Sequence, residues 1–239
     1  TADGYIAVLN AGSSTFLVRL TNTGTVSWAR KLTNASFSSN YVYRVKPAYS
    51  SATALPSFYI MATHFSGTGE MVIKTNSVGT ILWQKRVTHP TSGYSYVFRD
   101  LKVTSDTGCV VTGYLSGGGS SNAVIFKFSP SGSITLAKSY DFFSATSGSG
   151  FGISPLSTGG YVVTGSEGGS DDNLTFKVTS TGAITWGYKY TNAGINDLFG
   201  QAVVTDASGN AIVAGTNYPG ASSNTAFLMK LNSLGSVTF

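Results

Sequence analysis

Few residues of this 239-residue sequence have the type and spacing that enzyme chemistry requires. Its two histidines, His64 and His89, have no cysteine or acidic cluster nearby, so a zinc site is not indicated. Asp171 and Asp172 are adjacent, but a solvated turn explains them better than the carboxylate pair of a glycosidase or a calcium site. Ser149 has no strand-to-helix elbow around it. We therefore predict no catalytic residue, no metal, no cofactor and no enzymatic activity.

One basic residue recurs in a cassette that occurs five times. It stands five residues before a glycine and nine before a large apolar residue: Arg19, Gly24, Trp28; Lys74, Gly79, Trp83; Lys127, Gly132, Leu136; Lys177, Gly182, Trp186; Lys230, Gly235, Phe239. The five cations could form a ring that binds an anionic glycan. The alternative is that their stems cover apolar surface while the charges reach solvent. The aromatic residues leave a similar choice between packing and sugar stacking.

Two further groups of residues are candidates for glycan contacts. Four loop tyrosines could stack on a sugar: Tyr94, Tyr96, Tyr114 and Tyr218. Asn34 and Asn173 each begin an Asn-x-Ser/Thr acceptor motif for N-glycosylation. Of these two, Asn34 is predicted to lie in a loop and is the better acceptor.

The elements that hold these residues are predicted to be strands. The cassette glycines are 50 to 55 residues apart, and a period near 50 with several strands per unit is typical of a propeller. Helical periodicity is nearly absent. We predict an all-β fold in a single domain, 1–239: a five-bladed β-propeller of four-stranded antiparallel blades. The repeats fall at about 1–32, 41–87, 96–140, 150–190 and 199–239.

The count of strands is uneven. The second and third strands of the unit occur five times, whereas the first has only four candidates, near 41–46, 96–103, 151–155 and 199–204, and the fifth copy of the last strand is short. An open sheet edge invites strand addition. Three interpretations remain open: neighbouring domains complete a fragment, the segment 33–40 or 191–198 fills the gap, or another copy donates a strand. Ring closure is therefore predicted to be incomplete within the chain.

Composition excludes several classes of protein. The net charge of +5 is scattered without a basic run, so nucleic-acid binding is not indicated. The one cysteine, Cys109, lies in an apolar run and is predicted to be buried. No apolar stretch approaches the ~20 residues of a membrane span. The start at Thr1 fits a processed chain or an excised fragment.

The repeat resembles the bacterial-type β-propeller repeats of secreted and surface proteins. The stretch 157–165, which reads Ser-Thr-Gly-Gly-Tyr-Val-Val-Thr-Gly, and the segment from Phe176 to Trp186 carry the resemblance best. It covers nearly the whole chain and implies blades of four antiparallel strands. Such propellers serve mainly as scaffolds and binding modules, so the resemblance implies no single activity.

From these observations we expect a non-catalytic structural or adhesive module outside the cell, self-assembling into a filament or surface layer by strand donation. The partners would be further copies or neighbouring domains, with glycans as additional ligands. A carbohydrate-binding propeller is the alternative function, and a glycoside hydrolase-type propeller is the third.

Overall fold

The computed structural model describes residues 4–11, 14–32, 40–51, 54–64, 69–142, 148–167, 172–191, 197–218 and 224–239. They form eighteen strands in five separate antiparallel sheets. The strands are, sheet by sheet, β1 (Tyr5–Ala11), β2 (Ser14–Leu20) and β3 (Val26–Leu32); β4 (Asn40–Ala48), β5 (Ser57–His64), β6 (Glu70–Thr75) and β7 (Ile81–Val87); β8 (Ser95–Val103), β9 (Cys109–Gly117), β10 (Ser120–Phe128) and β11 (Ile134–Tyr140); β12 (Gly148–Pro155), β13 (Tyr161–Glu167), β14 (Asp172–Val178) and β15 (Ile184–Tyr190); β16 (Asp197–Thr205), β17 (Ala211–Tyr218) and β18 (Thr225–Leu231).

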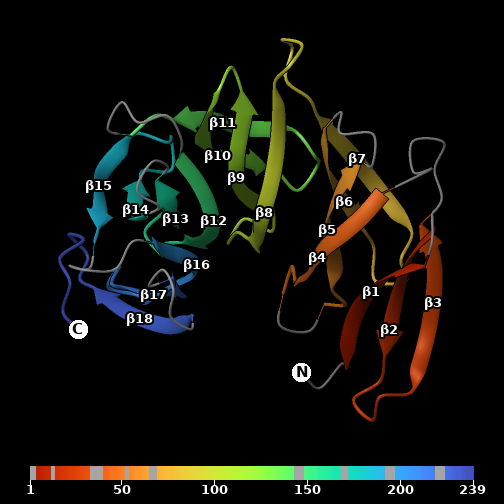
Figure 1. Ribbon diagram of the computed structural model, residues 1–239. Coiled ribbons are helices and arrows are strands. Elements are labelled where there is room, and N and C mark those ends of the chain that lie inside the picture. The colour runs from red at the N-terminus through yellow and green to blue at the C-terminus, as the bar shows by residue number, and fades with distance from the viewer. Residues whose placement is uncertain are drawn as a thin grey trace.

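The predicted all-β repeat architecture is confirmed, and the sheets follow one another along an open arc. In Figure 1 the strands β4, β8, β12 and β16 lie on the inner side of the arc, with the sheets β1–β3 and β16–β18 at its two ends. The sheets therefore do not close into a ring. Among the described residues no helix is present that could cross a membrane.

The uneven strand count that the sequence predicts is also present. Among the described residues the first sheet has no strand inside β1, and the last has no full strand beyond β18, where Val237 forms an isolated bridge to Leu231. The inner edge at β1 instead meets the next sheet: Asn10 Nδ2 donates to Val42 O at 3.1 Å, and Val42 N donates to Asn10 Oδ1 at 3.2 Å.

The cassette glycines lie in the turns that follow the third strand of the repeat unit. Gly79, for example, has φ of +81°, a left-handed conformation that glycine adopts at little cost. The strand before it carries a bulge between Lys74 and Thr75, so turn and bulge occur together as in a three-residue hairpin loop. The same turn recurs in every sheet, which is why the repeat is visible in the sequence.

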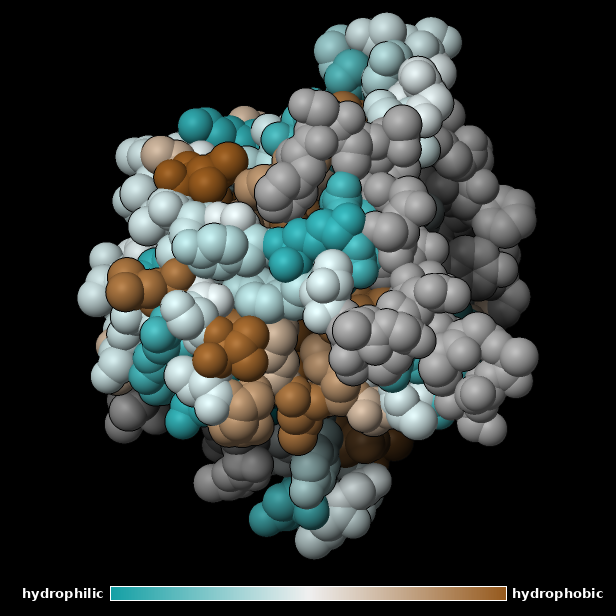
Figure 2. Space-filling model, turned by 60° about the vertical axis from the view of Figure 1, so that its left-hand side comes forward, coloured by the Kyte–Doolittle hydropathy of each residue, from teal (hydrophilic) through white to brown (hydrophobic). Residues whose placement is uncertain are grey.

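The core consists of four buried clusters, one between each successive pair of sheets. Both faces of β6, β9, β10, β13 and β14 are largely buried. β6, β9 and β10 carry apolar residues on both faces, as strands covered on both sides do. In β14 the residues Asn173 and Thr175 make one buried face polar. The last sheet has only one neighbour, and three of its apolar side chains are exposed: Val204, Ile212 and Leu228. Figure 2 shows hydrophobic side chains gathered low on the visible face, at the height that β18 has in Figure 1.

Candidate functional site

The cassette's basic residue and tryptophan meet the following sheet. Lys74 Nζ and Trp83 Nε1 both donate to Pro130 O, at 3.1 and 2.9 Å. Lys177 Nζ and Trp186 Nε1 both donate to Ser233 O, at 3.3 and 3.1 Å. The accepting carbonyl lies two residues before the turn glycine of the next sheet in both cases, so the cassette joins neighbouring sheets.

The other three members of the proposed cation ring have different contacts. Lys127 forms an ion pair with Asp106 of its own sheet. Arg19 Cζ lies 5.9 Å from the Phe58 ring centroid, and Lys230 Nζ lies 5.9 Å from the Phe239 ring centroid. Lys74, Lys127, Lys177 and Lys230 lie on the third strand of their sheets, and Arg19 lies on β2, the second strand of the first sheet. Anion binding by the five residues stays a prediction.

The three tyrosine candidates whose side chains the structure describes do not form one site. The rings of Tyr94 and Tyr96 lie 5.0 and 5.6 Å from the ring of His89, beside a pocket of about 530 Å³. Tyr114 lies elsewhere and accepts a hydrogen bond from Arg99 Nη2 at 3.3 Å. The side chain of Tyr218 lies outside the described residues.

Of the two glycosylation candidates, Asn34 lies outside the described residues. Asn173 is fully buried, and its Nδ2 donates to Thr164 Oγ1 and to Gly165 O, both at 3.0 Å. A glycan on this nitrogen would displace both contacts. The sequence motif at Asn173 is explained instead by the buried bond between Thr175 Oγ1 and Asn173 Oδ1, at 2.9 Å.

The interpretation of the acidic pair as a solvated turn is wrong for Asp172; Asp171 lies outside the described residues. Asp172 begins β14, is buried, and pairs with Lys189 Nζ at 2.7 Å. Glu167 at the end of β13 contacts the same nitrogen at 2.9 Å. Hydrogen bonds to Asp172 and Glu167 raise the pKa of Lys189. The two carboxylates are opposite each other in the ladder, so the cation between them offsets their repulsion.

A different set of residues, which the sequence analysis missed, forms a groove on the inner side of the arc. Each inner strand carries a β-bulge near its middle, and the bulged residues are Tyr43, Arg99, Phe151 and Gln201. A bulge re-aims the side chain it carries. The groove between β4 and β8 has a volume of about 480 Å³ and is lined by Tyr43, Arg44, Thr63 and Arg99, among others; we call it the inner groove.

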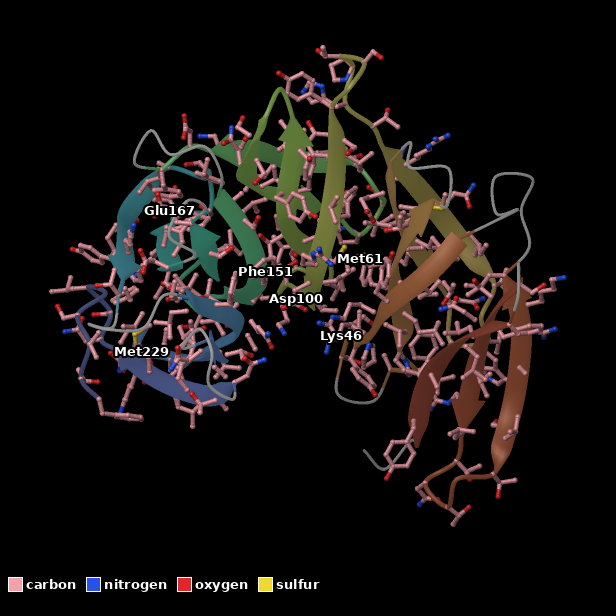
Figure 3. The ribbon with its side chains drawn as sticks, viewed as in Figure 1. Lys46, Met61, Asp100, Phe151, Glu167 and Met229 are labelled. Carbon is pink, nitrogen blue, oxygen red and sulfur yellow. The ribbon has the colours of Figure 1, made fainter. Side chains whose placement is uncertain are left out.

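Aromatic rings hold Arg99 in this groove. Its Cζ lies 5.4 Å from the Tyr114 ring centroid and 5.9 Å from that of Phe151, within cation–π distance of both. In Figure 3, Phe151, Asp100 and Lys46 all lie on the inner side of the arc.

Asp100 is the acidic residue of the inner strand β8, and both of its carboxylate oxygens have partners. Its carboxylate accepts from Leu101 N at 2.9 Å and from Ile153 N of the next sheet at 3.3 Å. It also pairs with Lys102 at 3.1 Å and Arg44 at 3.7 Å. Asp100 therefore joins β8 to β12 and orients two cations.

A second carboxyl group, Glu70, lies beneath the groove. It is 1% exposed, and Thr63 Oγ1 lies 2.7 and 2.9 Å from its two oxygens. Burial raises the pKa of Glu70 to about 7, although hydrogen bonds with Thr63 and the Phe98 backbone and the charge of Arg99 act in the opposite direction. Thr63 lines the groove, so its hydroxyl connects Glu70 to the open space.

The inner groove can thus offer aromatic surface, several cations and one carboxyl group that titrates near neutral pH. Within the described ranges no group of three or more histidine, cysteine or acidic residues could hold a metal ion. Cys109 is buried as predicted, and burial raises the pKa of its thiol. One sequence signal for the groove existed: Arg99 and Asp100 interrupt the apolar run between Tyr96 and Leu101.

Comparisons with known proteins support the fold. No protein-family model and no curated protein matches the sequence. The solved structures that it resembles include a proposed exo-beta-1,3-galactanase from Bifidobacterium bifidum s17, with TM-score 0.52 and 14% identity over 100% of this chain and 92% of that one. The Dos1 propeller has TM-score 0.56 and 13% identity, over 87% of this chain and 53% of that one. The polysaccharide lyase Uly1 has TM-score 0.52 and 12% identity, over 95% and 55%.

These likenesses place the chain, by fold, with the β-propellers; it spans just over half of the second and third of these proteins. They also correct two expectations. The prediction of a non-catalytic structural or adhesive module, and the prediction that the protein is not an enzyme, are contradicted because propellers of similar shape include a galactanase and a polysaccharide lyase. At these identities the likeness concerns the fold, and the chemistry has to be argued from the groove itself.

Proposed function

We propose that this protein binds an acidic polysaccharide outside the cell, with the inner groove as the binding site. The observation that carries the proposal is the charge of the inner strands β4 and β8. They carry the cations Arg44, Lys46, Arg99 and Lys102 against the single carboxylate Asp100. A uronate-bearing chain would pair with these cations, and the rings near Arg99 give sugar faces an apolar surface.

The groove also provides a geometric reason for binding an extended chain. Its volume of about 480 Å³ is that of a site for one or two sugar rings, and it lies between two inner strands rather than in a closed cavity. The bulges present Arg99 and Tyr43 from the middle of their strands, which are rigid elements and fix the side chains more firmly than loops would. A polymer could thus continue beyond the groove in both directions.

Isothermal titration with polygalacturonate, with a neutral β-glucan as comparison, tests this proposal. We expect wild-type protein to bind the acidic polymer, with affinity that falls as salt is added. Lys46→Gln and Arg99→Gln should each weaken binding about tenfold. Lys85→Gln removes the same charge from the exposed side of the outer strand β7 and should have no effect. Equal binding of both polymers, or equal effects of the Lys46 and Lys85 changes, would contradict the proposal.

Cleavage of the bound polysaccharide is the second candidate function. It is favoured by Glu70, whose pKa of about 7 suits a group that gives and takes protons near neutral pH, with the Thr63 hydroxyl between it and the groove. The similar structures named above are a proposed galactanase and a polysaccharide lyase, and their names support the choice of substrate class.

Incubation with the same polymers, followed by reducing-end and unsaturated-product assays, tests cleavage. Glu70→Gln and Thr63→Val should each lower the rate at least tenfold while leaving binding nearly unchanged. A wild-type rate that both variants retain would exclude this pair from the reaction.

A further inference from the structure

A second pocket lies at the other end of the inner strands from the inner groove. It has a volume of about 560 Å³ and is formed by the turns that follow β8, β12 and β16. Its lining includes Ser105, Leu156, Tyr161, Ser180 and Thr205, and we call it the turn pocket. The inner groove contacts the first half of β8, whereas Ser105 follows its last residue, Val103, so the two spaces are separate.

The turn pocket is lined by a tyrosine whose hydroxyl group has no protein partner. Tyr161 is 4% exposed as a residue, but its hydroxyl oxygen is not closed off from solvent and has no hydrogen-bond partner among the described residues. Other buried tyrosines differ: Tyr59 donates to Thr107 O at 2.7 Å, and Tyr140 donates to Gly182 O at 3.1 Å. The Tyr161 hydroxyl instead opens onto the pocket, where a ligand that accepts a hydrogen bond from it can take the place of water.

The chemistry of the pocket wall narrows the class of ligand. Lys127 and Asp106 line the pocket and are paired with each other. Asp206 also lines it, and its carboxylate accepts hydrogen bonds from Asn210. The other polar side chains of the wall carry hydroxyl groups, with the apolar side chain of Leu156 beside them. Burial, and to a smaller extent the charge of Asp106, raises the pKa of Tyr161 to about 12. The phenol is therefore protonated at neutral pH and can donate a hydrogen bond.

We propose that the turn pocket binds a neutral sugar, with the Tyr161 hydroxyl donating to a ring or glycosidic oxygen. A neutral sugar combines hydroxyl groups with an apolar face of C–H bonds, and this matches a wall of serine, threonine and leucine. The volume lies within the range of small-ligand sites and accommodates one or two rings. This site is distinct from the inner groove and does not depend on the function proposed for it.

Titration of isotope-labelled protein with lactose, cellobiose, maltose and xylobiose, followed by NMR, tests the proposal. We expect at least one disaccharide to shift the amide signals of residues 104–106 and 156–160. Tyr161→Phe keeps the ring and removes only the hydroxyl, so it should weaken that binding about tenfold, a factor that corresponds to one hydrogen bond. Tyr140→Phe removes a hydroxyl that serves the fold and should leave binding unchanged.

Several results would overturn the proposal. One is that none of the four disaccharides shifts those signals in the wild-type protein. Another is that Tyr161→Phe binds as well as wild type, in which case water alone serves the hydroxyl. A third is that Tyr140→Phe weakens binding as much as Tyr161→Phe does. Arg99→Gln, which tests the inner groove, should not change binding here, so the two proposals can fail separately.

Discussion

At the scale of single residues, two buried tyrosines of β11 and β13 have opposite hydrogen-bonding situations. Tyr140 donates to the buried carbonyl of Gly182, whereas Tyr161 has no partner among the described residues. Tyr140→Phe should therefore lower the free energy of unfolding by about 1 kcal/mol or more. Tyr161→Phe should change it by less than about 0.5 kcal/mol. Urea unfolding without sugar measures both, and an equal loss in the two variants would mean that Tyr161 has a structural partner.

Glu70 should make stability depend on pH. Its pKa is about 7 in the folded protein and near the ordinary 4.5 in the unfolded chain. Between these values the unfolded chain releases a proton that the folded protein keeps, so stability falls as pH rises from about 4.5 to 7. The free energy of unfolding should fall by about 3 kcal/mol over this range.

Glu70→Gln removes this titration while keeping a polar group beside Thr63. Its unfolding free energy should be nearly flat over the same pH range and should exceed that of the wild-type protein above pH 7. Denaturant unfolding at a series of pH values measures this. Parallel pH profiles for the two proteins would show that another group is responsible.

The residue scale also shows what the sequence can predict. Burial of Cys109 and of Trp186 follows from apolar periodicity, which is a local property. The burial of Glu70 and Asp172 depends instead on residues that are distant in the sequence. It results from the sheet that packs against each of them, and an acidic residue near a strand end has the same sequence pattern whether or not another sheet covers it.

At the scale of elements, close approach of β12 to β16 depends on one glycine. A Cβ on Gly152 would lie 2.9 Å from Ala202 Cα and 3.0 Å from Gln201 O, both backbone atoms. Gly152→Ala should therefore separate the two strands and cost about 1–3 kcal/mol.

Gly148 provides the matched control within the same strand. A Cβ there would meet nothing closer than Leu174 Cδ2, at 3.8 Å. Gly148→Ala should be neutral or slightly stabilising, since it also reduces the freedom of the unfolded chain. Thermal unfolding of both variants measures the difference, and equal melting temperatures would contradict a tight contact between β12 and β16.

The elements themselves were largely predictable, but the bulges of the inner strands were not. Turn glycines and alternating apolar residues fix the second and third strands of each unit, because hairpin pairing is local. The bulges at Tyr43, Arg99, Phe151 and Gln201 have no shared residue type. They match one another only in position, and each depends on packing across the inner side of the arc. The candidate site therefore could not be read from the sequence, although the strands that carry it could.

At the scale of the whole molecule, the arc leaves equivalent repeat positions in different surroundings. Leu17 and Leu228 both stand two residues before the cassette's basic residue. Leu17 is covered by the second sheet and is 0% exposed, whereas Leu228 of the last sheet is 65% exposed. The sequence predicts the same role for both, because the pattern around them is the same and only the neighbouring sheet differs.

This pair gives a direct measure of how the open arc affects stability. Leu17→Ala should lower the free energy of unfolding by about 2–5 kcal/mol, because it leaves a cavity in the cluster between the first two sheets. Leu228→Ala should change it by less than about 0.5 kcal/mol, as is usual for exposed positions. Denaturant unfolding at low protein concentration measures both. A large loss at Leu228 would mean that this face is covered in solution, since an exposed leucine has no packing to lose and only a covered one would cost as much as Leu17.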